Sequence, residues 1–118
     1  MYFQKMQVWK KAKILTIETY KICKTLPPEE KFALGDQMRR AAISIISNIA
    51  EGSGRGSQNE IRQFLRIARG STSELLAQLI VCHELCFIPS EKSELIINMA
   101  LEVQNMLSAL ISKPTYDN

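Results

Sequence analysis

The residues most able to do chemistry are basic, and most of them lie in the first two thirds of the chain. Arg62, Arg66 and Arg69 recur at i, i+4 and i+7, which places three guanidinium groups along one face of a helix. Such a row binds phosphates by bidentate hydrogen bonds, or it pairs with carboxylates inside the fold. We prefer internal pairing, because Arg66 and Arg69 directly follow the core positions Leu65 and Ala68.

The segment EGSGRGS, residues 51–57, is a glycine-rich loop that contains Arg55. Phosphate-binding loops of nucleotide-binding proteins follow a β-strand and end in Gly-Lys-Ser/Thr, and this segment has neither feature. The free N–H groups of a following helix, together with Arg55, could still hold an anion weakly. We therefore interpret the loop first as a corner between two helices.

The sequence contains no constellation typical of catalysis or metal binding. The single histidine, His83, lacks a glutamate three residues before it, so the Glu-x-x-His pattern of di-iron bundles is missing. Cys82 and Cys86 lie one turn apart and, with Cys23, would supply at most three zinc ligands. We interpret the cysteines as core thiols and expect no enzymatic activity, no metal and no cofactor.

Apolar residues recur at three- and four-residue steps, which predicts helices at about 5–25, 30–51, 57–87 and 90–112. Helices of this length with short corners predict an all-α fold, an antiparallel up-down-up-down four-helix bundle, and residues 1–118 fit a single domain. Trp9, Tyr20 and Phe64 fall on apolar faces, so we do not expect a platform on which bases stack.

The corners carry the usual helix-ending signals. Ser57 and Glu60 form a capping box, and Ser90 is the expected N-cap of the last helix, which Pro114 ends. The glycines at 52, 54 and 56 are expected to close the second helix in the left-handed conformation. Gly70, inside the third helix, is expected to permit a close helix contact.

The net charge of +3 is unevenly distributed along the chain. Residues 1–25 carry six lysines against Glu18, with Lys10, Lys11 and Lys13 crowded together, whereas residues 71–118 carry two lysines against six acids. This asymmetry favours either an anionic partner or self-association between unlike faces. An unevenly charged surface without a partner is an equally acceptable explanation of the composition alone.

Targeting and redox signals point to the cytoplasm. No run of 18 residues is free of charge, the N-terminus lacks an apolar signal core, and three cysteines make no disulfide framework. We expect a cytoplasmic protein that has no membrane partner.

Several motifs follow one another along nearly the whole chain. They are a Trp-x-x-Ala near the start (Trp9 and Ala12), a Gln-x-Arg-Arg-Ala-x-x-Ser-x-x-x-Asn-Ile-Ala-Glu-Gly signature (residues 37–52), an Arg-x-Ser (Arg55 and Ser57), and Phe-Leu-x-Ile-Ala-Arg-Gly-Ser (residues 64–71) followed by Glu-Leu (Glu74 and Leu75). Together these motifs resemble those of a known family, the 23S rRNA intervening-sequence proteins. The resemblance covers about residues 3 to 112.

The resemblance implies an antiparallel four-helix bundle without established enzymatic activity, encoded in bacteria within ribosomal RNA genes or in free-standing genes. Relatives assemble as rings of five, so we expect a homo-oligomer, a pentamer. A distant group of similar bundles assists reverse transcriptases of diversity-generating retroelements, where a basic surface binds nucleic acid. Gene location suggests ribosomal RNA as a partner.

These observations give one leading hypothesis and one rival. The leading hypothesis is a non-enzymatic bundle that binds structured RNA or DNA through phosphates, at Lys10, Lys11, Lys13, Arg55 and Arg62. The rival is a protein-interaction scaffold, or a factor like the reverse-transcriptase accessory proteins, that has no intrinsic RNA binding. Its basic first helix would pair with the acidic half of a neighbouring subunit. The polar residues of the signature are expected to form a structural network: Arg39, Arg40, Ser44, Asn48, Glu51, Ser57, Arg66, Arg69, Ser71 and Glu74.

Overall fold

The computed structural model describes residues 2–113, so Met1, Pro114 and the remaining four residues of the predicted 1–118 domain lie outside the described residues. The described range contains a short 3-10 helix and five α-helices and no strand, which confirms the all-α class. The helices are η1 (Phe3–Lys5), α1 (Gln7–Cys23), α2 (Pro28–Lys31), α3 (Leu34–Ser53), α4 (Gln58–Glu84) and α5 (Ser90–Ser112).

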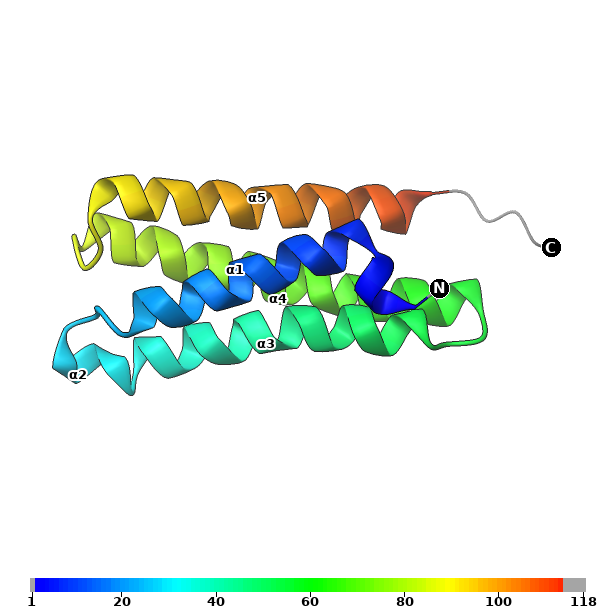
Figure 1. Cartoon of the computed structure of the whole chain (residues 1–118), viewed down its shortest axis with the longest axis horizontal. Coiled ribbons are helices and arrows are strands. Elements are labelled where there is room, and N and C mark those ends of the chain that lie inside the picture. Colours follow the sequence, from blue (N-terminus) through cyan, green and yellow to red (C-terminus); the bar gives the residue numbers. More distant parts are fainter. Residues whose placement is uncertain (1, 114–118) are drawn as a thin grey trace.

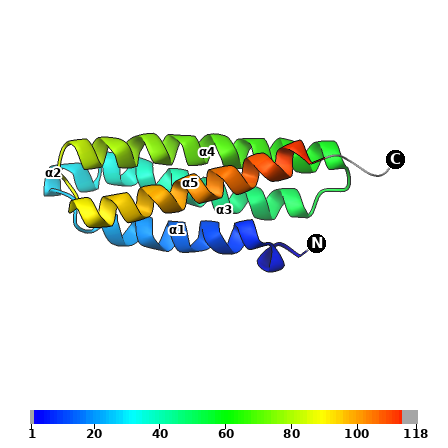
Figure 2. The ribbon, with the colours of Figure 1, turned by 90° about the horizontal axis from the view of Figure 1, so that it is seen from above.

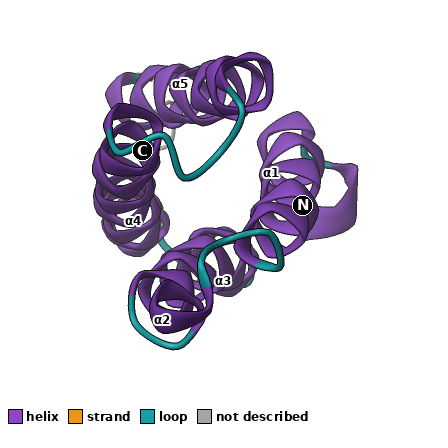
Figure 3. Cartoon of the chain, turned by 90° about the vertical axis from the view of Figure 1, so that its left-hand side faces the viewer, coloured by secondary structure: helices purple, strands orange, loops and turns teal. Residues whose placement is uncertain are grey.

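The four long helices lie side by side in an elongated body of 52 × 22 × 20 Å. Consecutive long helices run in opposite directions along its long axis (Figures 1 and 2). Around this axis the order is α1, α3, α4, α5, because α1 packs on α3 and α5 while α4 packs on the same two helices (Figure 3). The α3–α4 contact is the most extensive of the four and the α1–α5 contact is the smallest.

The core is formed by the apolar stripe of each long helix, as the helical period predicts. Leu15, Met38, Ile45, Leu79 and Leu107 are among the largest side chains that are fully removed from solvent. The few buried hydroxyls are satisfied locally because each donates to the carbonyl one turn before it, as Thr72 does to Ala68.

The prediction of one continuous second helix over 30–51 is wrong at its start. The helix is interrupted at Phe32 and Ala33, which separate α2 from α3. In a continuous helix the Lys31 carbonyl would accept from the amide of Gly35. Here it accepts from the Arg39 guanidinium, at 2.9 Å. At the break Phe32 points outward, and 83% of it is exposed.

The glycines act differently from the prediction. No described glycine has a positive φ, so the left-handed closure expected at residues 52–56 is wrong. A Cβ at Gly52 would lie 2.8 Å from the Cβ of Phe64, so this glycine instead lets α3 approach α4 closely. A Cβ at Gly70 would meet nothing within 4 Å, so the close contact expected there is absent.

The capping predictions have mixed outcomes. The Ser57 hydroxyl accepts from the Glu60 amide at 3.1 Å, as a capping box requires. Ser90 is not the N-cap of α5, since Pro89 occupies that position and Ser90 is the first helical residue. The Ser90 carbonyl instead accepts from the hydroxyl of Ser93, at 3.0 Å.

Helix α5 is long enough and apolar enough, by length and composition, to cross a membrane, although the charge rule applied to the sequence excluded such a segment. Only 22% of the most apolar 18-residue stretch of α5 is buried in the bundle, so its apolar residues are more numerous than the core requires. Leu95 and Leu101 are exposed to 65% and 38%. An apolar face of α5 therefore remains open in the single chain.

Candidate nucleic-acid interface

The three clustered lysines of α1 do not share one face. Successive residues of a helix are rotated by roughly 100°, so Lys10 and Lys13 lie on one side while Lys11 points elsewhere. The Lys11 ammonium lies 3.5 Å from the Glu102 carboxylate of α5, and both side chains are about half exposed. Lys11 thus bridges α1 and α5 and is separated from the other two.

Lys13 lies beside the only tryptophan. Its ammonium is 5.6 Å from the centroid of the Trp9 ring, and the Phe3 ring of η1 packs edge-on against the same indole, with 5.0 Å between the ring centroids. The aromatic pair fixes the N-terminal segment on α1. The Lys13 ammonium remains exposed at the edge of this cluster.

Two arginines of the row on α4 donate hydrogen bonds to α5 and the residue that follows it. Arg62 donates to the carbonyls of Ile111, at 3.1 Å, and Lys113, which are among the unpaired acceptors at the end of α5. Arg69 donates to the Ser108 hydroxyl at 3.4 Å. Arg66 is exposed and makes no hydrogen bond or ion pair within residues 2–113. The predicted phosphate-binding residue Arg62 is therefore occupied by the helix terminus.

Arg55 at the glycine-rich corner is also engaged, although we expected it to bind phosphate. Its guanidinium pairs with Glu51 at 2.5 Å and lies 4.7 Å above the Phe64 ring. The Ser57 hydroxyl lies 3.2 Å from the Glu60 carboxylate, which brings a negative charge to the N-terminus of α4. The corner satisfies its own polar groups and is a weak place for an anion.

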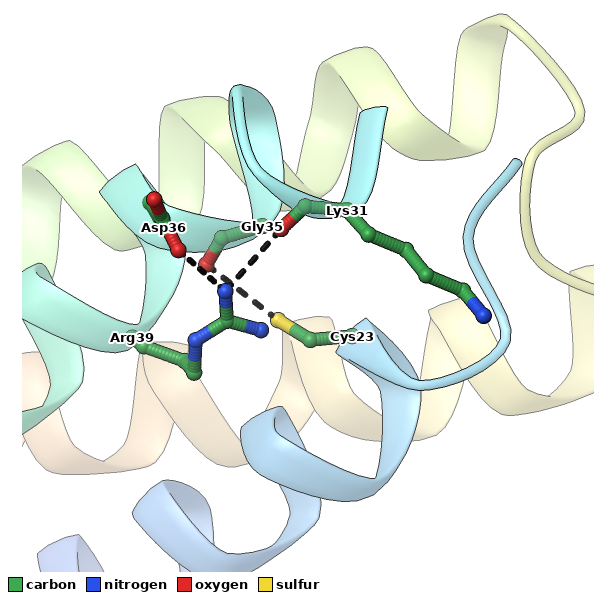
Figure 4. Close-up of polar contacts among 5 residues, drawn as sticks. All are labelled: Cys23, Lys31, Gly35, Asp36 and Arg39. Carbon is green, nitrogen blue, oxygen red and sulfur yellow. Dashed lines mark hydrogen bonds and ion pairs between the residues drawn. The ribbon is translucent and has the colours of Figure 1, made fainter. Parts of the chain in front are cut away.

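Arg39 belongs to a separate cluster at the α2–α3 break (Figure 4). It pairs with Asp36 and donates to the Lys31 carbonyl, and the buried Cys23 thiol lies beside it, 3.6 Å from the Gly35 carbonyl. Burial raises the pKa of the Cys23 thiol, and the positive charge of Arg39 opposes that rise. Arg39 therefore fixes the break between the two helices.

The cysteines do not form a metal site. Cys82 is buried 3.7 Å from the Met38 sulfur, and burial raises its pKa to about 11. Cys86 is exposed, so the interpretation of all three thiols as core residues is wrong for this one. No group of three or more potential ligands gathers anywhere in the described part of the chain.

The α3–α4 contact contains a small polar cluster. The hydroxyls of Ser44 and Ser71 are 2.7 Å apart, and the Asn48 amide donates to the carbonyl and hydroxyl of Ser44. Glu74 lies further along α4, 3.5 Å from the Gln78 amide. The signature residues thus make several separate local contacts and not the single network that we expected.

One hollow on the surface combines cationic, aromatic and hydroxyl groups. It lies between α1 and α3, has a volume of about 480 Å³, and is lined by Tyr20, Asp36, Arg39, Arg40, Ile43 and Ser44. Tyr20 and Ile43 are exposed to 39% and 40%. From the sequence we assigned Tyr20 to the apolar stripe. It lies at the edge of that stripe, next to the exposed Lys21, and this position could have indicated that its ring reaches the surface.

Arg40 is the cation of this hollow that remains exposed. It makes no hydrogen bond or ion pair within residues 2–113, whereas the neighbouring Arg39 is held by Asp36. Lys13 of α1 and Lys24, the C-terminal cap of that helix, stand seven residues before and four after Tyr20, so they share its side of the helix, and Lys10 adjoins Lys13. We call Lys10, Lys13, Lys24 and Arg40 the basic face.

Comparisons with known proteins agree with this architecture. The family model described as 23S rRNA-intervening sequence protein matches residues 4–109. A similar solved structure is that of a protein of unknown function from the S23 ribosomal protein family of Bacteroides thetaiotaomicron VPI-5482. It is 26% identical, covers 90% of this chain and 99% of its own, and has a TM-score of 0.84. A comparison with curated proteins finds no match. Since the family model spans nearly the whole chain, the chain belongs to the 23S rRNA-intervening sequence protein family.

Proposed function

We propose that this protein is a non-enzymatic, self-associating bundle that binds structured RNA through the phosphates contacted by its basic face. The observation that carries the proposal is the set of exposed cations along α1 and α3 that have no carboxylate partner within residues 2–113. Neither the family description nor that of the Bacteroides protein names an enzymatic activity. The free state of all three thiols agrees with a cytoplasmic location.

The basic face suits phosphates for an electrostatic reason. Cations already paired inside the fold, such as Lys11 with Glu102 and Arg55 with Glu51, would have to give up a partner to bind RNA. Lys10, Lys24 and Arg40 have no such partner among the described residues, so they can replace the counterions of a phosphate backbone directly. This distinction changes the residues that we expect to bind: Lys10 and Lys13 remain, and Lys11, Arg55 and Arg62 give way to Lys24 and Arg40.

Self-association is supported by the surface where α1 meets α5. Two hollows line this seam: one of 420 Å³, lined largely by Met6, Val8, Met106 and Leu110, and one of 240 Å³ around Ile22, Leu95 and Met99. Helix α1 carries four lysines against Glu18, and α5 carries three glutamates against Lys92. A second copy of the chain can match such adjacent basic and acidic strips, whereas the acids of α5 disfavour an anionic membrane.

The test measures binding of a labelled RNA hairpin by fluorescence anisotropy at several salt concentrations. If four phosphates are contacted, log affinity falls with log salt with a slope of about −3, so going from about 50 to 200 mM weakens binding on the order of 50-fold. The double variant Lys10→Ala/Lys13→Ala should bind more weakly, and its slope should be shallower by about 1 per lysine.

The matched control is Lys31→Ala/Arg66→Ala, which removes the same charge from two side chains that lie outside the basic face and the α1–α5 seam and make no ion pair within residues 2–113. It should retain the wild-type slope and most of the affinity. Equal losses in the two double variants would mean that net charge, and not the basic face, drives binding. Absence of binding at low salt would refute the RNA proposal.

A protein-recruiting scaffold is the second candidate, and the open apolar face of α5 favours it. Under this alternative the protein would assemble and bind a protein partner but would show no salt-dependent RNA binding. If Lys10→Ala/Lys13→Ala dissociated the oligomer, the lysines would be assigned to assembly. Retention of the oligomer with loss of RNA binding would favour the leading proposal.

A further inference from the structure

We infer that the hollow between α1 and α3 receives one unpaired base of the bound RNA, which stacks on the Tyr20 ring while an adjacent phosphate pairs with Arg40. The inference rests on the proposed RNA binding and adds what kind of RNA is recognised. It predicts a preference for loops, bulges or single strands over continuous duplex.

The first step of the argument is the shape and lining of the hollow. Its volume of about 480 Å³ is of the size that proteins use for small organic groups. Tyr20 and Ile43 contribute exposed apolar surface from the two helices, and Ser44 and the arginines contribute polar groups. An aromatic ring beside an aliphatic side chain and a cation is the combination used to hold an exposed base.

The second step concerns which charges are available. Asp36 is the only acid that lines the hollow, and it is neutralised by Arg39, which also donates to the Lys31 carbonyl. Arg40 therefore leaves the hollow with a net positive charge. Its planar guanidinium can pair with a phosphate in a bidentate manner, next to the base that the phosphate carries.

The third step concerns the hydroxyl groups. The Ser44 hydroxyl is already occupied, because it bonds to Ser71 of α4 and accepts from Asn48 of its own helix. The Tyr20 hydroxyl makes no hydrogen bond within the described residues and remains available for a base edge or a 2′-hydroxyl. The hollow thus offers a stacking ring, one phosphate-binding cation and one hydrogen-bonding hydroxyl.

Unpaired RNA fits this set better than a duplex does. In an A-form duplex the bases are stacked on one another and their faces are covered, so a protein ring can stack only on a base that has left the helix. An acidic peptide could pair with Arg40, but it would gain nothing specific from an aromatic ring at position 20. The ring is therefore the feature that separates the two kinds of ligand.

The experiment compares the full-length wild type with Tyr20→Leu, Tyr20→Phe and Arg40→Ala. The probes are a labelled RNA hairpin with an unpaired loop and a fully paired duplex of the same length. Tyr20→Leu should weaken hairpin binding about tenfold and leave the salt slope unchanged, because stacking releases no counterions. Tyr20→Phe keeps the ring and should stay within about threefold of the wild type, a loss typical of one neutral hydrogen bond.

Arg40→Ala should weaken binding and also make the salt slope shallower by about 1, since one phosphate contact is lost. Tyr2→Leu is the matched control, because Tyr2 is an exposed tyrosine outside the hollow, with its ring tilted against that of Phe3. It should bind as the wild type does. The wild type should prefer the hairpin to the duplex, and Tyr20→Leu should remove that preference.

A further variant guards against a folding defect in Tyr20→Leu. In a Trp9→Phe background, Tyr20→Trp places the only tryptophan in the hollow, and its fluorescence should be quenched when the RNA loop binds. Absence of quenching under conditions of saturation would overturn the inference. Wild-type affinity in a folded Tyr20→Leu protein would also overturn it and leave the RNA proposal intact, whereas wild-type protein without any RNA binding would refute both.

A competition experiment distinguishes RNA from an acidic peptide as the ligand of the hollow. Poly-glutamate should displace the hairpin poorly and should compete equally well with the wild type and with Tyr20→Leu. Displacement by poly-glutamate as effective as that by unlabelled hairpin would assign the hollow to an acidic peptide and overturn the inference.

Discussion

Cys86 has a backbone φ of 60°, in the left-handed region, directly after the C-terminal cap of α4. The Phe87 amide donates to the Cys82 carbonyl at 3.0 Å, and the Cys86 amide donates to the His83 carbonyl at 3.1 Å. These two bonds define a Schellman motif, in which glycine usually holds the left-handed position. A residue with a Cβ is strained there, so α4 ends in a motif that its own sequence does not favour.

Replacing Cys86 with glycine should stabilise the protein by about 1 kcal/mol, because the left-handed strain is removed. Part of the gain is offset by the greater freedom of glycine in the unfolded chain. Urea unfolding followed by circular dichroism measures the change. Cys86→Ala removes the same thiol and keeps the Cβ, so it should show no such gain. Equal stabilities of the two variants would contradict the argument.

Gly52 and Gly70 both lie inside helices, yet their surroundings differ. At Gly52 the Phe64 side chain of α4 leaves no room for a Cβ, whereas the space around Gly70 is open. The helix propensity of alanine favours both substitutions equally. Packing therefore decides the sign of each effect.

Gly52→Ala should destabilise the protein by about 1 to 3 kcal/mol, as overpacking does, and Gly70→Ala should stabilise it by about 1 kcal/mol. The two substitutions add the same methyl group, so each serves as the control for the other. Thermal unfolding should show midpoints on opposite sides of the wild type. Changes of the same sign would mean that the α3–α4 contact adjusts more freely than its distances indicate.

At the scale of the helix, the C-terminal end of α5 depends on a side chain from α4. Arg62 donates to the carbonyls of Ile111 and Lys113, which a helix cannot satisfy by itself. The guanidinium carries several donors in a fixed plane, so one side chain serves two carbonyls. The last turn of α5 is thereby tied to the first turns of α4.

Arg62→Ala should let the last turn of α5 fray and should cost about 1 kcal/mol or more, because two charge-assisted hydrogen bonds are lost. Hydrogen exchange should accelerate at the amides of residues 108–111 and remain slow in the middle of α5. Arg66→Ala is the matched control, since Arg66 lies on the same helix and is exposed. Similar exchange in both variants would show that Arg62 does not hold this end.

The helical period was sufficient to predict the long helices, because the apolar residues of each helix lie on the side that packs into the core. The bounds of α5 agree with the prediction, and α1 and α4 differ by a few residues at their ends. At the break between α2 and α3 Arg39 reaches the Lys31 carbonyl, a contact between residues eight apart that no periodicity reveals. Local signals therefore located the elements, and a tertiary contact interrupted one of them.

The candidate site was less accessible from the sequence, because a count of cations does not show which of them are paired. Lys11 and Arg62 looked as suitable for phosphate as Lys10, yet each is engaged with α5. Their partners are 49 to 91 residues away in the chain, so only the packed bundle identifies them. The helical period of α1 could already have shown from the sequence that Lys11 points away from Lys10 and Lys13.

At the scale of the whole molecule, the bundle is unevenly closed. The α1–α5 contact is the smallest of the four between neighbouring long helices. This seam has a hollow towards each end, and the Lys11–Glu102 pair joins its two helices. Leu95 is the most exposed large apolar residue of α5 and lines one of these hollows. The seam is therefore the surface on which we expect a second copy to pack.

Leu95→Glu should lower the mass in solution measured by light scattering, because a charge cannot be buried unpaired in an apolar contact. Circular dichroism should show unchanged helix content, since Leu95 is 65% exposed in the single chain. Val81→Glu on α4, where Val81 is 46% exposed, is the matched control and should keep the wild-type mass. A monomeric wild type, or equal masses for all three proteins, would refute this interface.

The three thiols of the chain differ so strongly in their surroundings that the fold supplies a natural attachment point. Cys23 and Cys82 are enclosed and their raised pKa values keep them protonated, while Cys86 stands exposed at the end of α4. A maleimide dye or a nitroxide should therefore react at one position per subunit without prior mutagenesis. In an assembly of several copies, counting dyes or measuring nitroxide separations would then give the number of subunits and the spacing of their α4 ends directly.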